Sequence, residues 1–271
     1  MSRIQKLIAA VGKKGVGKTF TTNKQIVDYV KGNPAKGVPG RRVLILDVNN
    51  EFEHIRTMNK KHVLAFSAHP TIEARRIAPF NDDGSKMSLL QVYETLSHII
   101  ANYSNGLLII EDINRYIGDH MKDDLIGAIC TNRHANLDVI LHYQSIGRIQ
   151  TKVWQNINII RFHQMTDSVV NHVNKFKDGA ECFFLAEHIV NYVCKTDPRY
   201  YLWVDVEILK IQGNIKPELK TIAINKYLNG NFKKLIKSQV GRIDIENPTA
   251  PPLTEPQIVD KEKKRLLETY F

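Results

Sequence analysis

Short apolar runs alternate along the chain with longer segments in which apolar residues recur at helical spacing. This alternation predicts a parallel β-sheet covered by helices on both faces, the α/β class. The predicted strands are 5–11, 42–47, 62–66, 106–111, 137–143, 157–163 and 200–208. The predicted helices are approximately 18–31, 87–104, 121–133, 146–153, 167–176 and 179–194. A large α/β core therefore occupies residues 1–208.

The pattern changes after residue 208. Helices predicted near 215–228 and 231–238 lie in a segment whose single acid is Glu218. Its basic residues are Lys210, Lys216, Lys220, Lys226, Lys233, Lys234, Lys237 and Arg242. A proline-containing linker and a charged segment at 256–269, able to form a short helix, follow. We therefore expect a core at 1–208, a basic helical extension at 209–242, and a linker with a tail at 243–271.

The first predicted strand runs directly into the sequence GKKGVGKT, residues 12–19. This is a phosphate-binding loop, whose glycines allow backbone N–H groups to surround phosphates and whose following helix directs its positive end at them. The predicted ATP-binding residues are Gly12, Lys13, Lys14, Gly15, Val16, Gly17, Lys18, Thr19 and Phe20. Lys18 supplies a charge to the β- and γ-phosphates, and the Thr19 hydroxyl can ligate Mg²⁺. The sequence therefore predicts a P-loop NTPase.

The chain has a net charge of +10 and a pI near 9.4. This favours a polyanionic partner such as nucleic acid; a solvated helical face is the alternative for the lysines of 210–242. The three cysteines show no metal-binding spacing, which indicates a reducing compartment. No apolar run is long enough to span a bilayer and no signal peptide is evident, so we expect a cytoplasmic protein without a membrane segment.

Acidic residues follow two of the predicted strands. Glu111 and Asp112 end an apolar strand, where one acid can face Mg²⁺ and the other the attacking water. Asp47 ends another strand and Glu51 follows it in a loop. Asp47 is a second candidate metal ligand, because ligands of open α/β sheets collect at carboxyl strand ends. Ordinary turn and helix-cap roles remain the alternative for these acids.

Gln144 ends the strand predicted at 137–143, where its amide can sense a γ-phosphate or hold a water. An ordinary turn amide is the alternative. Arg133 lies just before this strand and Arg148 shortly after it. Either arginine can act as a finger that reaches a neighbouring subunit's nucleotide, or can be a plain surface residue.

Taken together, GKKGVGKT, ILDVNNEF, LLIIEDINRY and TNRHANLDVILHYQS resemble the HerA/FtsK superfamily of P-loop motors. Residues 132–144 are especially similar to the zonula-occludens-toxin-like ATPases of filamentous phages, and also to genome-packaging ATPases of other small viruses. The resemblance covers approximately residues 4–165. It implies a RecA-like (ASCE) core, Mg-ATP hydrolysis at subunit interfaces, and a ring, usually a hexamer, that moves double- or single-stranded DNA.

The departures from these families narrow the prediction. The toxin-like proteins carry a membrane segment after the ATPase domain, and the cellular motors carry extra N-terminal domains; neither is recognised in this chain. A viral packaging ATPase fits best, in the host cytoplasm or at a virion vertex, with 210–242 facing DNA and the tail docking on a neighbouring subunit or a capsid protein. If the protein is a motor, we expect Lys18 and Mg²⁺ to stabilise the charge on the γ-phosphoryl group. Glu111 or Asp112 would orient the attacking water, and Glu51 is a further candidate for this role. Gln144 would report the loss of the phosphate to the elements that hold DNA.

Two other functions remain open. Lys13 and the stretch 40–47 resemble a ParA/MinD-like partitioning switch, although Lys14-Gly15 replaces that family's paired glycines. Such switches form nucleotide-sandwich dimers, whereas motors form rings. A nucleotide-binding structural protein with slow or absent turnover is the third possibility.

Overall fold

The computed structural model describes residues 5–113, 123–176, 179–230, 232–242 and 251–271, without the side chains of 123, 124, 132 and 133. Within these residues, eight strands form one sheet in the order β3-β2-β4-β5-β1-β6-β7-β8. The strands are β1 (Leu7–Val11), β2 (Arg42–Leu46), β3 (Ala74–Ile77), β4 (Gly106–Ile110), β5 (Asp138–Tyr143), β6 (Ile159–His163), β7 (Tyr201–Asp205) and β8 (Lys210–Gln212). The helices are α1 (Lys18–Lys31), α2 (Val63–Ala68), α3 (Leu89–Asn102), α4 (Asp123–Cys130), α5 (Thr151–Trp154), α6 (Val173–Phe176), α7 (Ala180–Val193), α8 (Pro217–Asn229), α9 (Lys233–Gln239) and α10 (Glu255–Tyr270).

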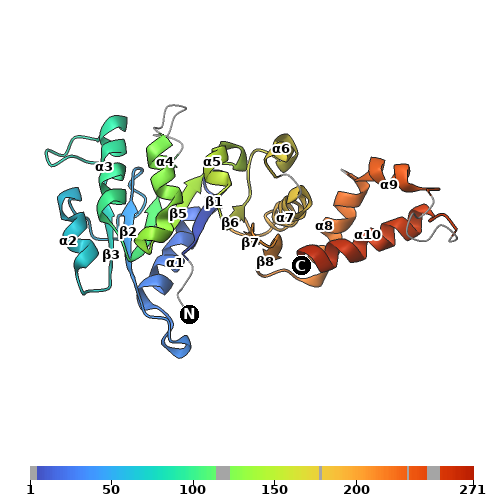
Figure 1. Ribbon diagram of the computed structural model, residues 1–271, viewed down its shortest axis with the longest axis horizontal. Helices are drawn as coiled ribbons and strands as arrows, with labels where there is room; N and C mark the ends of the chain where they lie inside the picture. The colour runs from blue at the N-terminus through green and yellow to red at the C-terminus, as the bar shows by residue number, and fades with distance from the viewer. Residues whose placement is uncertain (1–4, 114–122, 177–178, 231, 243–250) are drawn as a thin grey trace.

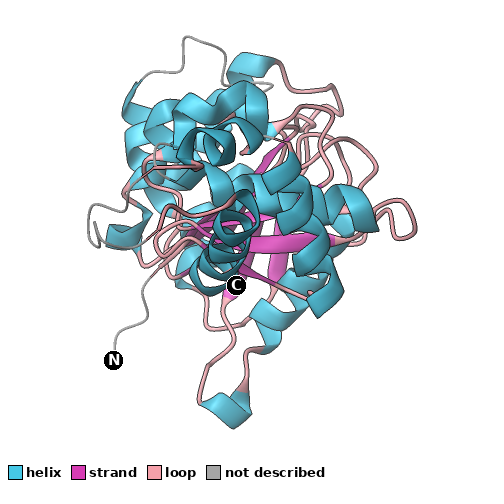
Figure 2. Ribbon diagram, turned by 90° about the vertical axis from the view of Figure 1, so that its right-hand side faces the viewer, coloured by secondary structure: helices cyan, strands magenta, loops and turns pink. Residues whose placement is uncertain are grey.

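The central strands are buried on both faces, as parallel strands between two helical layers must be. Alternate residues of β2 and β4 pack on opposite sides of the sheet. Val43 and Ile45 share one cluster with Ile26 of α1, whereas Leu44 and Leu46 share the other with Leu96 of α3. Figure 1 shows the strands crossing the elongated molecule, with α2 and α3 at one end and α8, α9 and α10 at the other. Seen along the long axis in Figure 2, helices surround the strands.

The predicted strand at 62–66 is wrong. Those residues lie in the turn Lys60–His62 and in helix α2, and the strand that pairs with β2 is Ala74–Ile77. A short apolar run does not distinguish a strand from a buried helix by its periodicity. The strand observed there carries Arg75 and Arg76. Arg76 is buried, and its charge is tolerated because its Nη1 lies 2.8 Å from Asp47 Oδ2.

The end of the sheet also differs from the prediction. The segment predicted as one strand at 200–208 contains only β7, and β8 follows it as a further strand. Both β6–β7 and β7–β8 pair antiparallel, so the sheet is mixed rather than wholly parallel. Helix α10 packs against β8, so this edge of the sheet is partly covered. Short antiparallel strands at the edge of a parallel sheet are common.

The charged tail forms α10, which packs on its own chain. Its buried residues are Ile258, Leu266 and Tyr270. Arg265 donates to both carboxylate oxygens of Glu181 on α7, at 2.8 and 3.0 Å, and the Tyr270 hydroxyl donates to the same carboxylate at 2.7 Å. Burial opposes ionisation of Glu181, but these hydrogen bonds outweigh it and hold its pKa below the ordinary value. The division at residues 208 and 242 remains a prediction. None of the described helices is long and apolar enough to cross a membrane.

Two adjacent leucines test whether α10 is part of the folded structure. Leu266 is fully buried and Leu267 is 40 % exposed. We expect Leu266→Ala to lower the free energy of unfolding by about 2–5 kcal/mol, because it leaves a cavity. Leu267→Ala should change it by less than about 0.5 kcal/mol. Urea denaturation measures both, and equal effects of the two variants would show that α10 is not packed as described.

Candidate nucleotide-binding site

The phosphate loop connects the central strand β1 to α1 and is fixed to both neighbouring strands. The Gly12 N–H donates to the Tyr143 carbonyl at the end of β5 at 3.1 Å, and the Lys13 N–H donates to the Gln164 carbonyl after β6 at 2.9 Å. Gly15 and Gly17 have φ of 83° and 84°, the left-handed region that favours glycine. A Cβ at Gly12 would lie 2.7 Å from that of His163. The glycines of the motif are therefore required by the shape of this loop.

The two polar residues that begin α1 face the predicted site. Lys18 Nζ donates to the carbonyl oxygens of Gly12 and Lys13, and burial lowers the pKa of Lys18 against the opposing effect of Glu51 and Asp112. The Thr19 hydroxyl donates to Glu51. No side chain caps the N-terminus of α1. Its first N–H groups are therefore available to an anion.

Glu111 is the most strongly perturbed acid near the loop. It follows β4, is 2 % exposed, and its Oε2 accepts no hydrogen bond from the described residues. Burial, followed by the charges of Glu51 and Asp47, raises the pKa of Glu111 to about 9. Without a nearby cation this carboxyl is therefore protonated at neutral pH.

Asp47, a predicted candidate metal ligand, is held by three hydrogen bonds from protein groups. Its Oδ1 accepts from the Glu51 N–H at 2.8 Å, and its Oδ2 accepts from the Phe52 N–H at 3.0 Å and from Arg76 at 2.8 Å. Both oxygens are thus engaged by protein donors. In this structure Asp47 shapes the loop that brings Glu51 to Thr19.

The residues around Thr19 fit a magnesium ion that is shared with a nucleotide. Glu111 supplies a buried oxygen without a hydrogen-bond donor, and the Glu51 carboxylate already contacts Thr19. Among the described residues no group of three or more His, Cys, Asp or Glu forms a metal site on its own. Mg²⁺ commonly takes one or two protein oxygens and completes its shell with phosphates and water. Thr19 and Glu111 are the residues that would hold it.

The ends of β4 and β5 are joined by a side-chain contact. Gln144 Nε2 lies 3.3 Å from Asp112 Oδ1, and Asp112 has a φ of 43°. The predicted sensor amide therefore contacts one of the two predicted catalytic acids. Arg133 lies in the turn Asn132–Ala135, and its side chain is outside the described part of the chain. Arg148 is exposed in the turn Ile146–Arg148.

A cavity of about 640 Å³ lies beside the phosphate loop. The predicted site residues that line it are Lys14, Gly15, Gly17, Lys18, Thr19, Phe20, Glu51, Glu111, Asp112 and Gln144. Gly12, Lys13 and Val16 belong to the loop but do not line the cavity, and Lys13 lies near Cys194. The sequence analysis missed Asn49, His142, Tyr143 and Arg199. Arg199 precedes β7, and no motif marks it.

Buried polar groups of β5 and β6 hold the start of α1, the helix that follows the phosphate loop. Arg161 of β6 is fully buried and donates to the Lys18 carbonyl at 3.1 Å and to Thr22 Oγ1 at 2.6 Å. Burial lowers the pKa of Arg161 to about 9, so it remains charged at neutral pH. Burial, with the charge of Arg161, holds the pKa of His142 well below its ordinary value, and its Nε2 lies 2.9 Å from Thr22 Oγ1. These contacts fix the first turn of α1 to the sheet.

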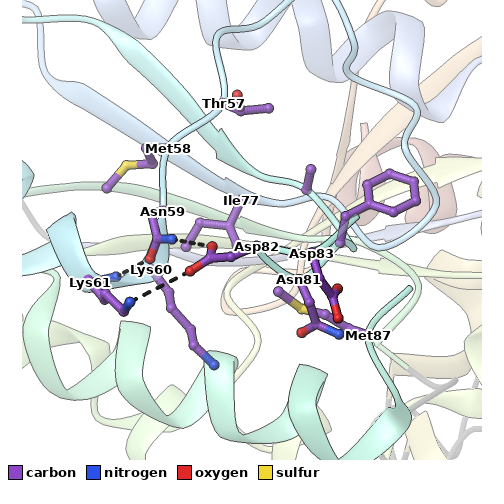
Figure 3. A pocket seen from close by; sticks show the side chains of 12 residues that line it. Thr57, Met58, Asn59, Lys60, Lys61, Ile77, Asn81, Asp82, Asp83 and Met87 are labelled. Carbon is purple, nitrogen blue, oxygen red and sulfur yellow. Dashed lines mark hydrogen bonds and ion pairs between the residues drawn. The ribbon is translucent and has the colours of Figure 1, made fainter. Parts of the chain in front are cut away.

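A second cavity of about 640 Å³ lies at the β3 edge and does not include the phosphate loop. Figure 3 shows Asn59 and Lys61 directed at Asp82. Asn59 Nδ2 donates to Asp82 Oδ1 at 2.7 Å, and Lys61 Nζ lies 3.6 Å from Asp82 Oδ2. Three polar residues of this cavity thus interact with one another, and the candidate nucleotide site is the cavity beside α1, which contains the phosphate loop.

Comparison with known proteins identifies the fold. No protein-family model matches the sequence, and no curated protein sequence matches it. Among solved structures, the genome packaging NTPase B204 of Sulfolobus turreted icosahedral virus 2 in complex with AMP is similar, with a TM-score of 0.50 and 16 % identity over 79 % of this chain and 99 % of that chain. The sulfate complex of the same protein has a TM-score of 0.51 and 16 % identity, over 78 % of this chain and 96 % of that chain. Its ATP-γS complex has a TM-score of 0.50 and 15 % identity, over 76 % of this chain and 95 % of that chain.

This similarity confirms the predicted fold: the chain has the α/β P-loop NTPase fold, with a mostly parallel sheet between helices. The three structures are of one viral genome packaging NTPase, and genome-packaging ATPases of small viruses are one of the groups that the sequence motifs resemble.

The raised pKa of Glu111 predicts how stability depends on pH. Between about pH 4.5 and 9 the unfolded chain releases this proton and the folded chain keeps it. The free energy of unfolding therefore falls as pH rises, by up to about 1.4 kcal/mol per unit from this group. We expect Glu111→Gln, which mimics the protonated form, to lack this loss.

Thermal melts without nucleotide at pH 5, 7 and 9 measure the effect. Glu111→Gln should gain stability over the wild type as pH increases, whereas Glu94→Gln, at an exposed position on α3, should follow the wild type. Parallel curves for all three proteins would show that Glu111 titrates normally.

Proposed function

We propose that this protein is an ATP-hydrolysing DNA translocase that packages a viral genome. The observation that supports the proposal is that three groups of predicted site residues lie at one edge of the sheet: the phosphate loop, the acids after β4, and Gln144 after β5. Lys18 and Thr19 lie beside Glu111, and Asp112 contacts Gln144. Hydrolysis needs a phosphate cradle, a buried carboxylate and a residue that senses the phosphate, and this edge offers all of them.

In the proposed reaction Lys18 and the N-terminal N–H groups of α1 hold the triphosphate. Bound Mg²⁺ supplies charge on the phosphate oxygens, with Thr19 and Glu111 as its protein neighbours. Glu111 or Asp112 orients the attacking water, and Glu51 is a further candidate. Asp112 and Gln144 then act together, and the loss of the γ-phosphate changes their contact. Glu51 releases Thr19 when the nucleotide binds.

The proposed DNA-facing surface is narrower than the whole basic segment. Lys210 Nζ donates to the Glu268 carbonyl at 2.8 Å, and Lys220 Nζ lies 5.1 Å from the centre of the Phe271 ring. These two lysines therefore stabilise the position of α10. The exposed basic residues that remain are Lys216, Lys226, Lys233, Lys234, Lys237 and Arg242. Such a patch attracts phosphates in a salt-dependent way.

The assembly is proposed from the resemblance. It implies a homo-oligomeric ring, usually a hexamer, in which Arg133 or Arg148 of one subunit reaches the nucleotide of the next. Because α10 is packed on its own chain, a neighbouring subunit or capsid protein would meet only its exposed face. The host cytoplasm or a virion vertex is the corresponding location.

No contact specifically favours the partitioning switch. Lys13, which resembles the signature lysine of ParA/MinD proteins, does not line the cavity and lies near Cys194. A dimer that forms only with ATP would favour the switch, whereas a ring would favour the motor.

The proposal predicts ATP hydrolysis that duplex or single-stranded DNA stimulates. Lys18→Ala should lower the rate by roughly 10²- to 10³-fold, because it removes charge from the transferred phosphoryl. Phosphate release with and without DNA measures this, together with electron microscopy of particles. ATP binding without DNA-stimulated turnover and without rings would instead indicate the nucleotide-binding structural protein.

The basic surface can be tested separately from the ATPase site. Lys233→Glu combined with Lys234→Glu should weaken DNA binding and reduce the magnitude of its salt dependence by about 2, if each lysine meets one phosphate. The control is Lys31→Glu combined with Lys36→Glu, which changes the net charge equally at exposed positions near the end of α1. Equal effects of both pairs would show that only net charge matters.

A further inference from the structure

An aromatic ring stands at the mouth of the nucleotide cavity. Phe20 follows Thr19 in the first turn of α1, lines the cavity and is 45 % exposed. Two cations lie over this ring, Arg199 and Lys24, each 4.6 Å from its centre.

Arg199 is held at the cavity by its surroundings. It lies in the turn between α7 and β7, where its N–H donates to Asp197 Oδ1 at 3.1 Å. Its stem packs on Gly17, since a Cβ there would lie 3.1 Å from Arg199 Cγ. Its guanidinium forms no ion pair with another described residue, and it faces the cavity with Phe20. Arg199 therefore presents a planar cation at the cavity, with its stem on Gly17 and its backbone bonded to Asp197.

The order of the strands indicates which end of a nucleotide these residues meet. Glu111 and Gln144 follow β4 and β5, on one side of β1 in the sheet. Arg199 comes from the opposite side, beyond β6. The γ-phosphate must lie near the residues that activate water and sense phosphate. The nucleoside end of the same molecule therefore extends toward Phe20 and Arg199.

We propose that Phe20 and Arg199 form a stacking subsite for the base of the nucleotide, with a preference for purines. This inference rests on the proposed function, because it assumes a triphosphate on the loop. Every base offers a π-face to an aromatic ring and to a guanidinium plane. A purine covers more of this platform than a pyrimidine does. The contact is made by the base and leaves the phosphates to Lys18 and α1.

The test compares ligands with and without a base. Isothermal titration calorimetry measures binding of ATP, CTP and inorganic tripolyphosphate, in Mg²⁺ buffer, to the wild type and to Phe20→Ala, Arg199→Ala, Arg199→Lys and Lys24→Ala. Phe20→Ala and Arg199→Ala should weaken ATP about 5- to 100-fold, the size of one lost stacking contact. Both should reduce the preference for ATP over CTP and leave tripolyphosphate binding unchanged.

Two variants serve as matched controls. Arg199→Lys keeps the charge and loses the plane, so it should weaken ATP and not tripolyphosphate. Lys24→Ala removes the other cation over the same ring; since Lys24 does not line the cavity, it should leave both affinities unchanged. Melting temperatures equal to that of the wild type would confirm that each variant is folded.

Several results would overturn the subsite. Unchanged ATP affinity in Phe20→Ala and Arg199→Ala would exclude a stacking role, and an equal loss for tripolyphosphate would assign Arg199 to the phosphates instead. A different result would contradict the proposed function. If the variants change ATP binding as expected but the wild type does not hydrolyse ATP in the presence of DNA, the stacking subsite is supported and the proposed motor function is contradicted.

Discussion

The position of the phosphate loop depends on one buried cation, Arg161. Its guanidinium reaches from β6 to the first two turns of α1, where it donates to Lys18, Thr22 and Gln25. No carboxylate among the described residues forms an ion pair with it. Such a charge is costly to bury. It is tolerated because several oxygens accept its hydrogen bonds and because His142 beside it stays neutral. Replacing Arg161 would therefore remove the side-chain hydrogen bonds that join the first two turns of α1 to β6.

The site holds charges of both signs. Lys18 places a positive charge at the start of α1, and Glu51 and Glu111 place acidic groups beside Thr19. In the proposed complex the phosphates would meet Lys18, and a bound cation would lie at the acidic groups. Neither component alone would balance the site. This explains why the strongest pKa perturbation of an acid lies where the cation is expected.

The sequence predicted the parts of the site that combine a strand with a characteristic polar end. The phosphate loop, Glu111-Asp112 and Gln144 each follow an apolar run, and parallel strands bring such ends together. It did not predict β3, because this strand carries Arg75 and Arg76, whose charges are paired with Glu73 and Asp47. Arg161 lies in a predicted strand, yet only the packing of α1 shows its role. Arg199 approaches Gly17 from far along the chain, and local patterns carry no information about such contacts.

The reversal of β7 has a mechanical consequence. Because β7 is antiparallel to β6, the connection between them starts and finishes at the edge of the sheet that holds the phosphate loop. Its first residue, Gln164, accepts a hydrogen bond from Lys13, and near its end Arg199 packs on Gly17. The segment that contains α7 is therefore tied to the loop at two points, while α7 itself packs on β6, β7 and β8. Helix α8 packs on α7, and α9 contacts α8 and α10. A continuous series of packed elements therefore connects the phosphate loop with the lysines of α9.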